Sequence, residues 1–204
     1  MKFRKSMLVT TFLLFAAGCG QSDPTGSSSA AVSLGSGPTS VSLSGATTAQ
    51  GTSDSSPVAT SGGSFSTCGL TGTWEADVYV DTSGAANQYN IRYQITNTTA
   101  SGTGFRLVQV TDYSNDGTVD VDYRTNLPGN HHPFMASRGS GDAPIIFDFT
   151  TDPIPSTSGS NSSKWFFVNA ESSTYATTGG HIDIWTVGGL SPCTITTSAA
   201  YPHN

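Results

Sequence analysis

Charged residues are scarce in this sequence: only 11% of its 204 residues are Asp, Glu, Lys or Arg, against roughly 25% in an average soluble domain. Lys and Glu, which are good helix formers, occur after residue 5 only as Lys164, Glu75 and Glu171. Ser, Thr and Gly, which disfavour helix interiors, are abundant instead. The composition therefore argues against a mainly helical protein. The 14 acidic residues against 8 basic ones also argue against nucleic acid as a partner.

The sequence also lacks an apolar run long enough to span a bilayer as a helix. Its longest run, from Met7 to Ala17, follows three basic residues, Lys2, Arg4 and Lys5. This arrangement is typical of a signal peptide, which we assign to residues 1–18.

The signal peptide ends in Ala16-Ala17-Gly18-Cys19, which resembles the lipobox of bacterial lipoproteins. The resemblance implies that Cys19 carries acyl chains such as palmitate after cleavage on its N-terminal side. It also implies a lipid anchor in the bacterial cell envelope. Gly20 and Gln21 follow the cysteine, which is compatible with sorting to the outer membrane or cell surface. The alternative is an ordinary secretory signal cut nearby, with Cys19 left as a free thiol.

Three cysteines are an odd number for an exported protein. If Cys19 carries lipid, Cys68 and Cys193 remain as a pair, and export permits a disulfide between them. Cleavage of the signal peptide leaves five basic residues and all 14 acidic residues, so the mature chain has a net charge of −9. Such a chain is repelled by anionic lipid, and the acyl anchor must hold it at the membrane.

Residues 19–66 form a segment of Ser, Gly, Thr and Ala, with Asp23 and Asp54 as its only charges and no aromatic residue before Phe65. Its isolated Val and Leu residues cannot bury enough apolar area to fold, so we predict a disordered linker. The alternative is a short strand from this segment that docks on the domain. Its random-coil span is on the order of 40 Å.

All three Trp and all seven Tyr follow residue 66, which predicts one compact domain over residues 67–204. Apolar and polar residues alternate with period two, as in Trp74 to Val80 and Tyr89 to Thr96. Stretches rich in Gly, Ser, Asn and Pro separate further candidate strands at 104–111, 118–125, 144–150, 164–169, 181–187 and 192–198. The sequence thus predicts an all-β fold of about eight strands. Short connections at 82–87 and 97–103 favour an antiparallel meander, either an up-and-down barrel or a β-sandwich.

One motif at the start of this domain is Gly72-Thr73-Trp74. It resembles the Gly-x-Trp opening of calycin barrels, the family of lipocalins and avidins, whose first strand begins with that Trp. The resemblance implies a cavity for an apolar or small ligand. The alternative is that Trp74 is only an aromatic residue of the core.

A second motif runs from Asp112 to Asp120 and places oxygen ligands at alternate positions with Gly117 at the sixth. A calcium ion takes six to eight oxygen ligands, and a glycine at that position allows the sharp bend. The flanking segments are expected strands, so the motif resembles the calcium hairpins of integrin-type repeats. Calcium is the predicted cofactor, in a structural role, and the alternative is an ordinary acidic hairpin built on Asp116-Gly117. The predicted ligands are the side chains of Asp112, Ser114, Asp116 and Asp120 and the carbonyl of Thr118.

No enzyme motif is found. There is no Gly-x-Ser-x-Gly, no unassigned cysteine and no phosphate-binding Gly-rich loop. His131, His132, His181 and Asp183 are metal-ligand types, but nothing in the sequence brings the two segments together, and histidines on a polar loop are usually only solvated. We therefore predict a protein that is not an enzyme.

The sequence leaves two functions open. The first is a cell-envelope lipoprotein that binds a small ligand or carbohydrate. The second is a surface adhesion or structural envelope protein that binds no small ligand but contacts another protein. Exposed aromatic residues would serve either, and the candidates are Tyr79, Trp165, Phe166, Phe167 and Trp185.

Overall fold

A computed structural model describes residues 31–47, 56–81, 88–100, 102–111, 113, 117–140, 143–156, 161–170, 172, 174–189 and 191–202. Within these ranges all regular elements are strands, as the composition predicts. Among the same residues, no helix is long and apolar enough to cross a membrane. The signal peptide assigned to residues 1–18 and the lipidation site Cys19 lie outside them.

The described residues form twelve strands. They are β1 (Val32–Leu34), β2 (Thr39–Ser42), β3 (Ala59–Thr67), β4 (Leu70–Asp81), β5 (Gln88–Asn97), β6 (Phe105–Val110), β7 (Val119–Tyr123), β8 (Met135–Arg138), β9 (Ile145–Asp148), β10 (Phe166–Ala170), β11 (Tyr175–Thr186) and β12 (Cys193–Pro202).

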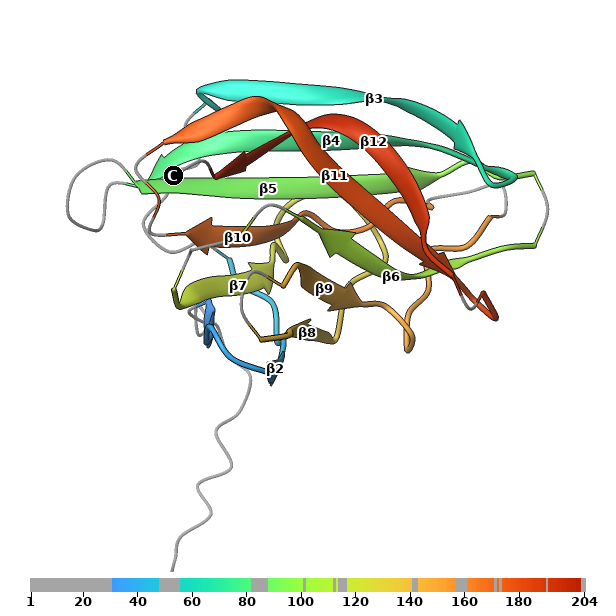
Figure 1. The fold of residues 1–204 in the computed structure, drawn as a ribbon. Helices are drawn as coiled ribbons and strands as arrows, with labels where there is room; N and C mark the ends of the chain where they lie inside the picture. Colours follow the sequence, from blue (N-terminus) through green and yellow to red (C-terminus); the bar gives the residue numbers. More distant parts are fainter. Residues whose placement is uncertain are drawn as a thin grey trace, which may run out of the picture.

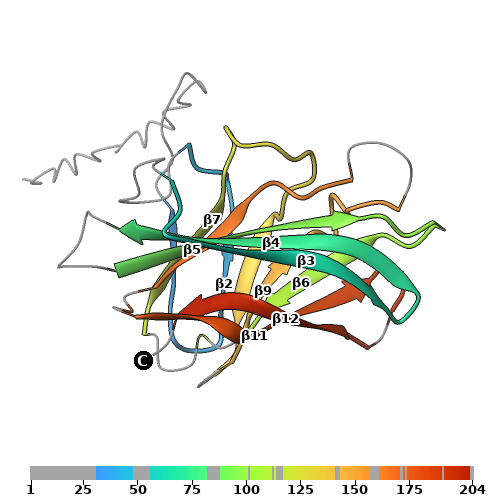
Figure 2. The ribbon, with the colours of Figure 1, turned by 90° about the horizontal axis from the view of Figure 1, so that it is seen from above.

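These strands build two six-stranded antiparallel sheets (Figure 1). The first sheet has the order β1-β7-β10-β5-β4-β3, and the second has the order β12-β11-β6-β9-β8-β2. Seen from above, the long β11–β12 hairpin lies beside β3 and β4 (Figure 2). The fold is a β-sandwich, so the barrel alternative is wrong.

All eight strands expected from the sequence are present, as β4 to β7 and β9 to β12. The hairpin across residues 82–87 is also confirmed, since β4 and β5 pair over ten residue positions. The expected hairpin at residues 97–103 is wrong, because β5 belongs to the first sheet and β6 to the second. Asn97 explains this crossing: its buried side-chain amide donates to the carbonyls of Thr103 and Ile154 and directs the chain toward the other layer.

Part of the predicted linker belongs to the fold. β1, β2 and β3 lie within residues 19–66 and pair with β7, β8 and β4. The structure shows the alternative expected from the sequence, strands of this segment that dock on the domain, and backbone pairing joins them to the sheets. The few apolar residues suffice for anchorage, since Leu34, Leu43 and Phe65 are buried in the core.

The core lies between the two sheets and consists of the inward-facing residues of both layers. The first sheet contributes residues such as Val78, Ile91 and Val121, and the second contributes Phe147 and Ile184, all fully buried. Trp74 is 8% exposed and belongs to this core.

The predicted disulfide between Cys68 and Cys193 is present, with a Cα to Cα distance of 6.2 Å. Cys68 and Gly69 both have positive φ, which is the conformation of a tight two-residue turn between β3 and β4. Cys193 is the first residue of β12. The disulfide therefore joins the two sheets at one side of the sandwich, where β3 and β12 are edge strands. At the opposite side the consecutive strands β1 and β2 link the same two layers.

Candidate functional site

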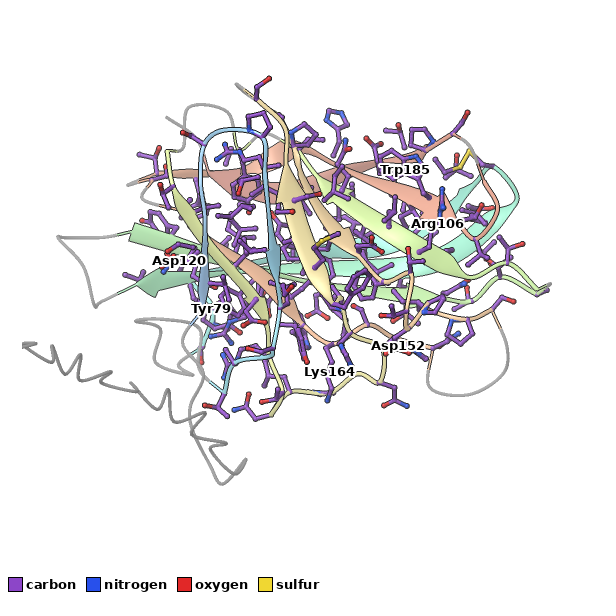
Figure 3. All side chains as sticks on the ribbon, turned by 90° about the horizontal axis from the view of Figure 1, so that it is seen from below. Tyr79, Arg106, Asp120, Asp152, Lys164 and Trp185 are labelled. Carbon is purple, nitrogen blue, oxygen red and sulfur yellow. A yellow bond between two sulfur atoms is a disulfide. The ribbon has the colours of Figure 1, made fainter. Side chains whose placement is uncertain are left out.

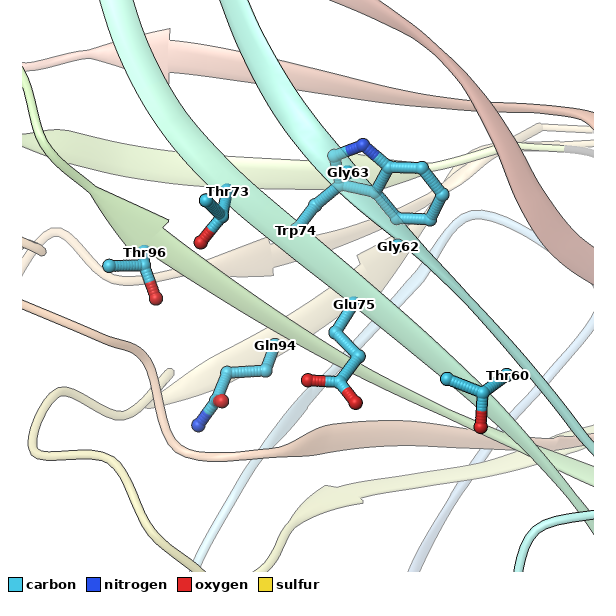
Figure 4. A pocket seen from close by; sticks show the side chains of 8 residues that line it. All are labelled: Thr60, Gly62, Gly63, Thr73, Trp74, Glu75, Gln94 and Thr96. Atoms are coloured by element: carbon cyan, nitrogen blue, oxygen red, sulfur yellow. The ribbon is translucent and has the colours of Figure 1, made fainter.

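The outer face of the first sheet carries an open groove over β3, β4 and β5. It has a volume of about 410 Å³ and is lined by Thr60, Gly62, Gly63, Thr73, Trp74, Glu75, Gln94 and Thr96 (Figure 4). Strand alternation explains the polar lining, because the apolar residues of β4 and β5 face the core and the intervening polar residues face outward. Trp74 belongs to the core face and borders the groove beside its β3 partner Gly63, which has no side chain to cover it.

Cross-strand pairs form the floor of the groove. Glu75 lies directly across from Gln94, and Thr73 lies across from Thr96. On the other side of β4, Gly62 is the partner of Glu75. Gly62 has no side chain to cover its neighbour, and a Cβ placed there would lie 3.0 Å from the carbonyl oxygen of Trp74. The glycine therefore leaves the Glu75 side chain accessible from the β3 side.

Neighbouring chain segments hold the β5 side of the groove in place. The Gln94 amide nitrogen donates to the carbonyls of Pro128, at 3.1 Å, and Ser163, at 3.0 Å. The Thr96 hydroxyl lies 2.7 Å from the hydroxyl of Ser162. Side chains fixed in this way are pre-organised, so a ligand would not have to order them on binding.

Glu75 is the ionisable side chain that lines the groove. It is half-buried and makes no hydrogen bond or ion pair with another described residue. Its pKa is raised above the ordinary glutamate value, first by burial and second by the charge of Asp77, two residues further along the same strand face. An unpaired, partly desolvated carboxylate is a strong acceptor for hydroxyl or amine donors.

The same outer face is covered further along by residues 43–47, which we call the N-terminal strap. The Asp122 carboxylate accepts a hydrogen bond from the Gly45 backbone N–H at 2.9 Å. The Arg124 guanidinium donates to the Thr47 carbonyl at 2.8 Å. Asp122 and Arg124 are both fully buried. The strap thus divides the outer face into a closed region beside β7 and the open groove over β3 to β5.

Sequence reasoning did not single out these charged residues or the groove. Alternation on β4 and β5 places Glu75 and Gln94 on the polar face, but it does not show which polar faces stay open. A further buried charge, Arg92, lies with its guanidinium carbon 3.7 Å from the ring centre of Tyr79. A sequence signal for this contact exists, because Tyr79 and Arg92 are outward residues on the two strands of one predicted hairpin.

The predicted calcium ligands are only partly described. Asp112, Ser114 and Asp116 lie outside the described residues. Thr118 is exposed, and Asp120 accepts a hydrogen bond of 2.6 Å from the Ser33 hydroxyl of β1. In the part of the chain that the structure describes, no three His, Cys, Asp or Glu residues come together as a metal site. Calcium binding stays a prediction.

The histidines of the polar loop find a partner that the sequence did not indicate. His131 Nδ1 lies 2.8 Å from one Asp152 oxygen, and the His132 backbone N–H donates to the other at 3.0 Å. The His132 ring stacks on Tyr123 with a centroid distance of 4.8 Å. Asp183, considered with them from the sequence, instead accepts a hydrogen bond from Gln109. Contacts within the fold thus account for this cluster.

Most of the aromatic residues considered for a binding surface are buried. Tyr79, Trp165, Phe166 and Phe167 are at most 9% exposed. Phe167 does face outward from its sheet, but it packs against Ala46 of the N-terminal strap and against Ala31. Trp185 is half-buried on β11 of the second sheet, in the same layer as Arg106 of β6 (Figure 3). The groove is therefore the better candidate for a binding site.

Comparison of the chain with protein-family models, curated proteins and solved structures finds no match. The chemistry of the groove is therefore the basis on which a function can be assigned.

Proposed function

We propose that this protein is a lipid-anchored cell-envelope protein whose β domain binds carbohydrate in the groove over β3, β4 and β5. The observation that carries the proposal is the lining of the groove, where hydroxyl, amide and carboxylate side chains stand side by side on two rigid strands.

Carbohydrates present many hydroxyl groups in fixed directions, and proteins bind them with polar groups of this kind. The hydroxyls of Thr60, Thr73 and Thr96 can each donate or accept a hydrogen bond. The Glu75 carboxylate can accept two bonds from neighbouring hydroxyls. The groove volume falls within the range of small-ligand sites. These features favour a polar ligand over an apolar one.

The envelope location rests on the leader and on Cys19. The disulfide between Cys68 and Cys193 supports export, because such bonds persist in oxidising compartments. Since β1 begins at Val32, the segment between Cys19 and the folded domain is shorter than the composition predicts. We therefore expect the domain to be held closer to the membrane than a free linker over residues 19–66 would allow.

The experiment is a calorimetric titration of the protein with a panel of soluble oligosaccharides, including neutral, acidic and amino sugars. We expect at least one class to bind, and Thr73→Val to weaken that binding about threefold to tenfold by loss of one hydrogen bond. Thr194→Val is the matched control, because Thr194 is also an exposed strand residue but lies on β12. Absence of binding across the panel, or equal losses in both variants, would leave the adhesion or structural role as the better explanation.

A further inference from the structure

We infer that the ligand of the groove is an amino sugar with a free, positively charged amine, which binds Glu75. This inference rests on the proposed carbohydrate function and narrows it to a ligand class. Its basis is that the groove offers unused hydrogen-bond acceptors and a negative charge at Glu75 that no described lining residue compensates.

The first observation concerns hydrogen-bond donors and acceptors. Among the described lining side chains, the threonine hydroxyls can donate or accept, and N–H groups occur only on Gln94 and on the core residue Trp74. The Gln94 amide nitrogen has two hydrogens, and both are used by the carbonyls of Pro128 and Ser163. The Gln94 carbonyl oxygen and the two Glu75 oxygens remain as acceptors with no partner among the described residues. These three acceptors favour a ligand that brings donors, and an ammonium group brings three.

The second observation concerns charge. Glu75 is unpaired, and the nearby carboxylate of Asp77 adds a second negative charge, which raises the pKa of Glu75. Among the described residues, no basic side chain lines the groove. Arg92 of β5 lies directly across from Asp77 with its guanidinium over the Tyr79 ring. Lys164 donates to the Leu127 carbonyl at 3.0 Å. A positive charge on the ligand would compensate the Glu75 carboxylate, for which the described residues of the groove supply no cation.

Acetylation of the amine removes the charge attraction to Glu75 and two of the three donors, because an N-acetyl group is neutral and has a single N–H. Charge-assisted hydrogen bonds are roughly twice as strong as neutral ones, and partial burial of Glu75 strengthens the attraction. The groove should hence distinguish a free amino sugar from its acetylated counterpart.

The test compares two probes that share their linkage and length, the β-1,4-linked tetramer of glucosamine and that of N-acetylglucosamine, by calorimetry with the protein. We expect the glucosamine tetramer to bind at least tenfold more tightly. In Glu75→Gln, which keeps the shape but loses the charge, this preference should fall below threefold. Asp183→Asn is the control for overall charge, since Asp183 lies on the second sheet and Asn retains an oxygen for the Gln109 hydrogen bond. It should leave the preference intact.

Three results would overturn the inference. If the acetylated tetramer binds as tightly as the free amine, the amine subsite is wrong, although carbohydrate binding stands. If Asp183→Asn lowers the preference as much as Glu75→Gln, the attraction belongs to the net charge of the protein and not to the groove. If no oligosaccharide binds at all, the proposed function and the inference fail together. Thermal melts of both variants establish that each is folded.

Discussion

The backbone N–H of Gly45 donates a hydrogen bond to the buried carboxylate of Asp122 at 2.9 Å. This contact fastens the N-terminal strap to β7, although the strap has the composition of a linker. Ala46 continues the attachment through two backbone bonds, to the Tyr123 carbonyl at 2.8 Å and from the Thr125 N–H at 3.0 Å. Backbone bonds and one buried carboxylate thus add to the apolar contacts of the strap, in which Leu43 is buried in the core and Ala46 packs against Phe167.

Gly45→Ala should loosen the strap. Gly45 has a φ of 82°, and an added Cβ would lie 2.5 Å from Thr125 Cγ2 and 2.8 Å from the Tyr123 ring. The left-handed conformation and the steric overlap together should lower the free energy of unfolding by about 2 to 4 kcal/mol. Denaturant unfolding measures the loss. Gly37→Ala is the control, because nothing lies within 4 Å of its Cβ position, and a change of more than about 0.5 kcal/mol there would contradict the explanation.

The stability of the protein should fall as the pH rises from about 4 toward neutrality. Burial raises the pKa of Asp122 in the folded protein, even though the N–H groups of Tyr123 and Gly45 lower it. The folded state therefore binds this proton more tightly than the unfolded state does. The resulting stabilisation is complete below the unfolded pKa and is lost as the pH rises through the folded pKa.

Asp122→Asn tests this dependence, since an amide does not ionise but keeps one acceptor oxygen for the strap. We expect the free energy of unfolding of the variant to vary less with pH between about 4 and 7 than that of the wild type. Urea titrations at several pH values provide the comparison. Parallel curves for the two proteins would rule out Asp122 as the source. Glu75→Gln should have an effect of the same sign, because the pKa of Glu75 is also raised.

Replacement of Cys68 and Cys193 by Ser should destabilise the domain. The bond closes a sequence separation of 125 residues, for which the chain-entropy model gives about 4 to 5 kcal/mol and experiments on native disulfides about 2 to 5 kcal/mol. Thermal or denaturant unfolding of the double variant measures the loss. A reductant should lower the stability of the wild type to that of the variant and leave the variant unchanged. If the variant is less stable than the reduced wild type, the Ser side chains themselves disturb the structure.

Much of the sheet structure could be predicted from local sequence pattern. Alternation and turn residues located eight of the strands, and the expected loop at 82–87 also fixes register. Glu75 and Gln94 lie seven residues from its two ends, Thr82 and Asn87, so equal counting pairs them as the structure does. The pairing of Glu75 with Gln94 in the floor of the groove could therefore be predicted from the expected hairpin.

The remaining features depend on partners distant in sequence. Ser, Thr and Gly in β1, β2 and β3 become strands because β7, β8 and β4 offer them backbone partners. The burial of Asp122 depends on a strap 77 residues earlier in the chain. Likewise, the donors of Gln94 are used by Pro128 and Ser163, and only the folded chain brings these carbonyls to it. Local patterns carry no information on such pairings.

The guanidinium of Arg138 lies beside the acidic loop at 112–120 and provides a positive charge there. Arg138 is buried, and its guanidinium donates to the carbonyls of Tyr113 and Gly117, the latter at 2.9 Å. A single arginine therefore joins the described residues on both sides of Asp116. Arg138 and a calcium ion are thus two separate means of stabilising this loop, and they can be tested separately.

The spacing of the loop predicts that calcium raises the melting temperature of the wild type and that Asp116→Ala abolishes this rise. Thermal melts in calcium and in chelator measure both effects, and calorimetry measures the heat of binding. Equal melting temperatures in calcium and chelator would contradict the calcium prediction. In that case Arg138→Met should still destabilise the domain by about 1 to 3 kcal/mol, because the buried Tyr113 carbonyl loses its donor.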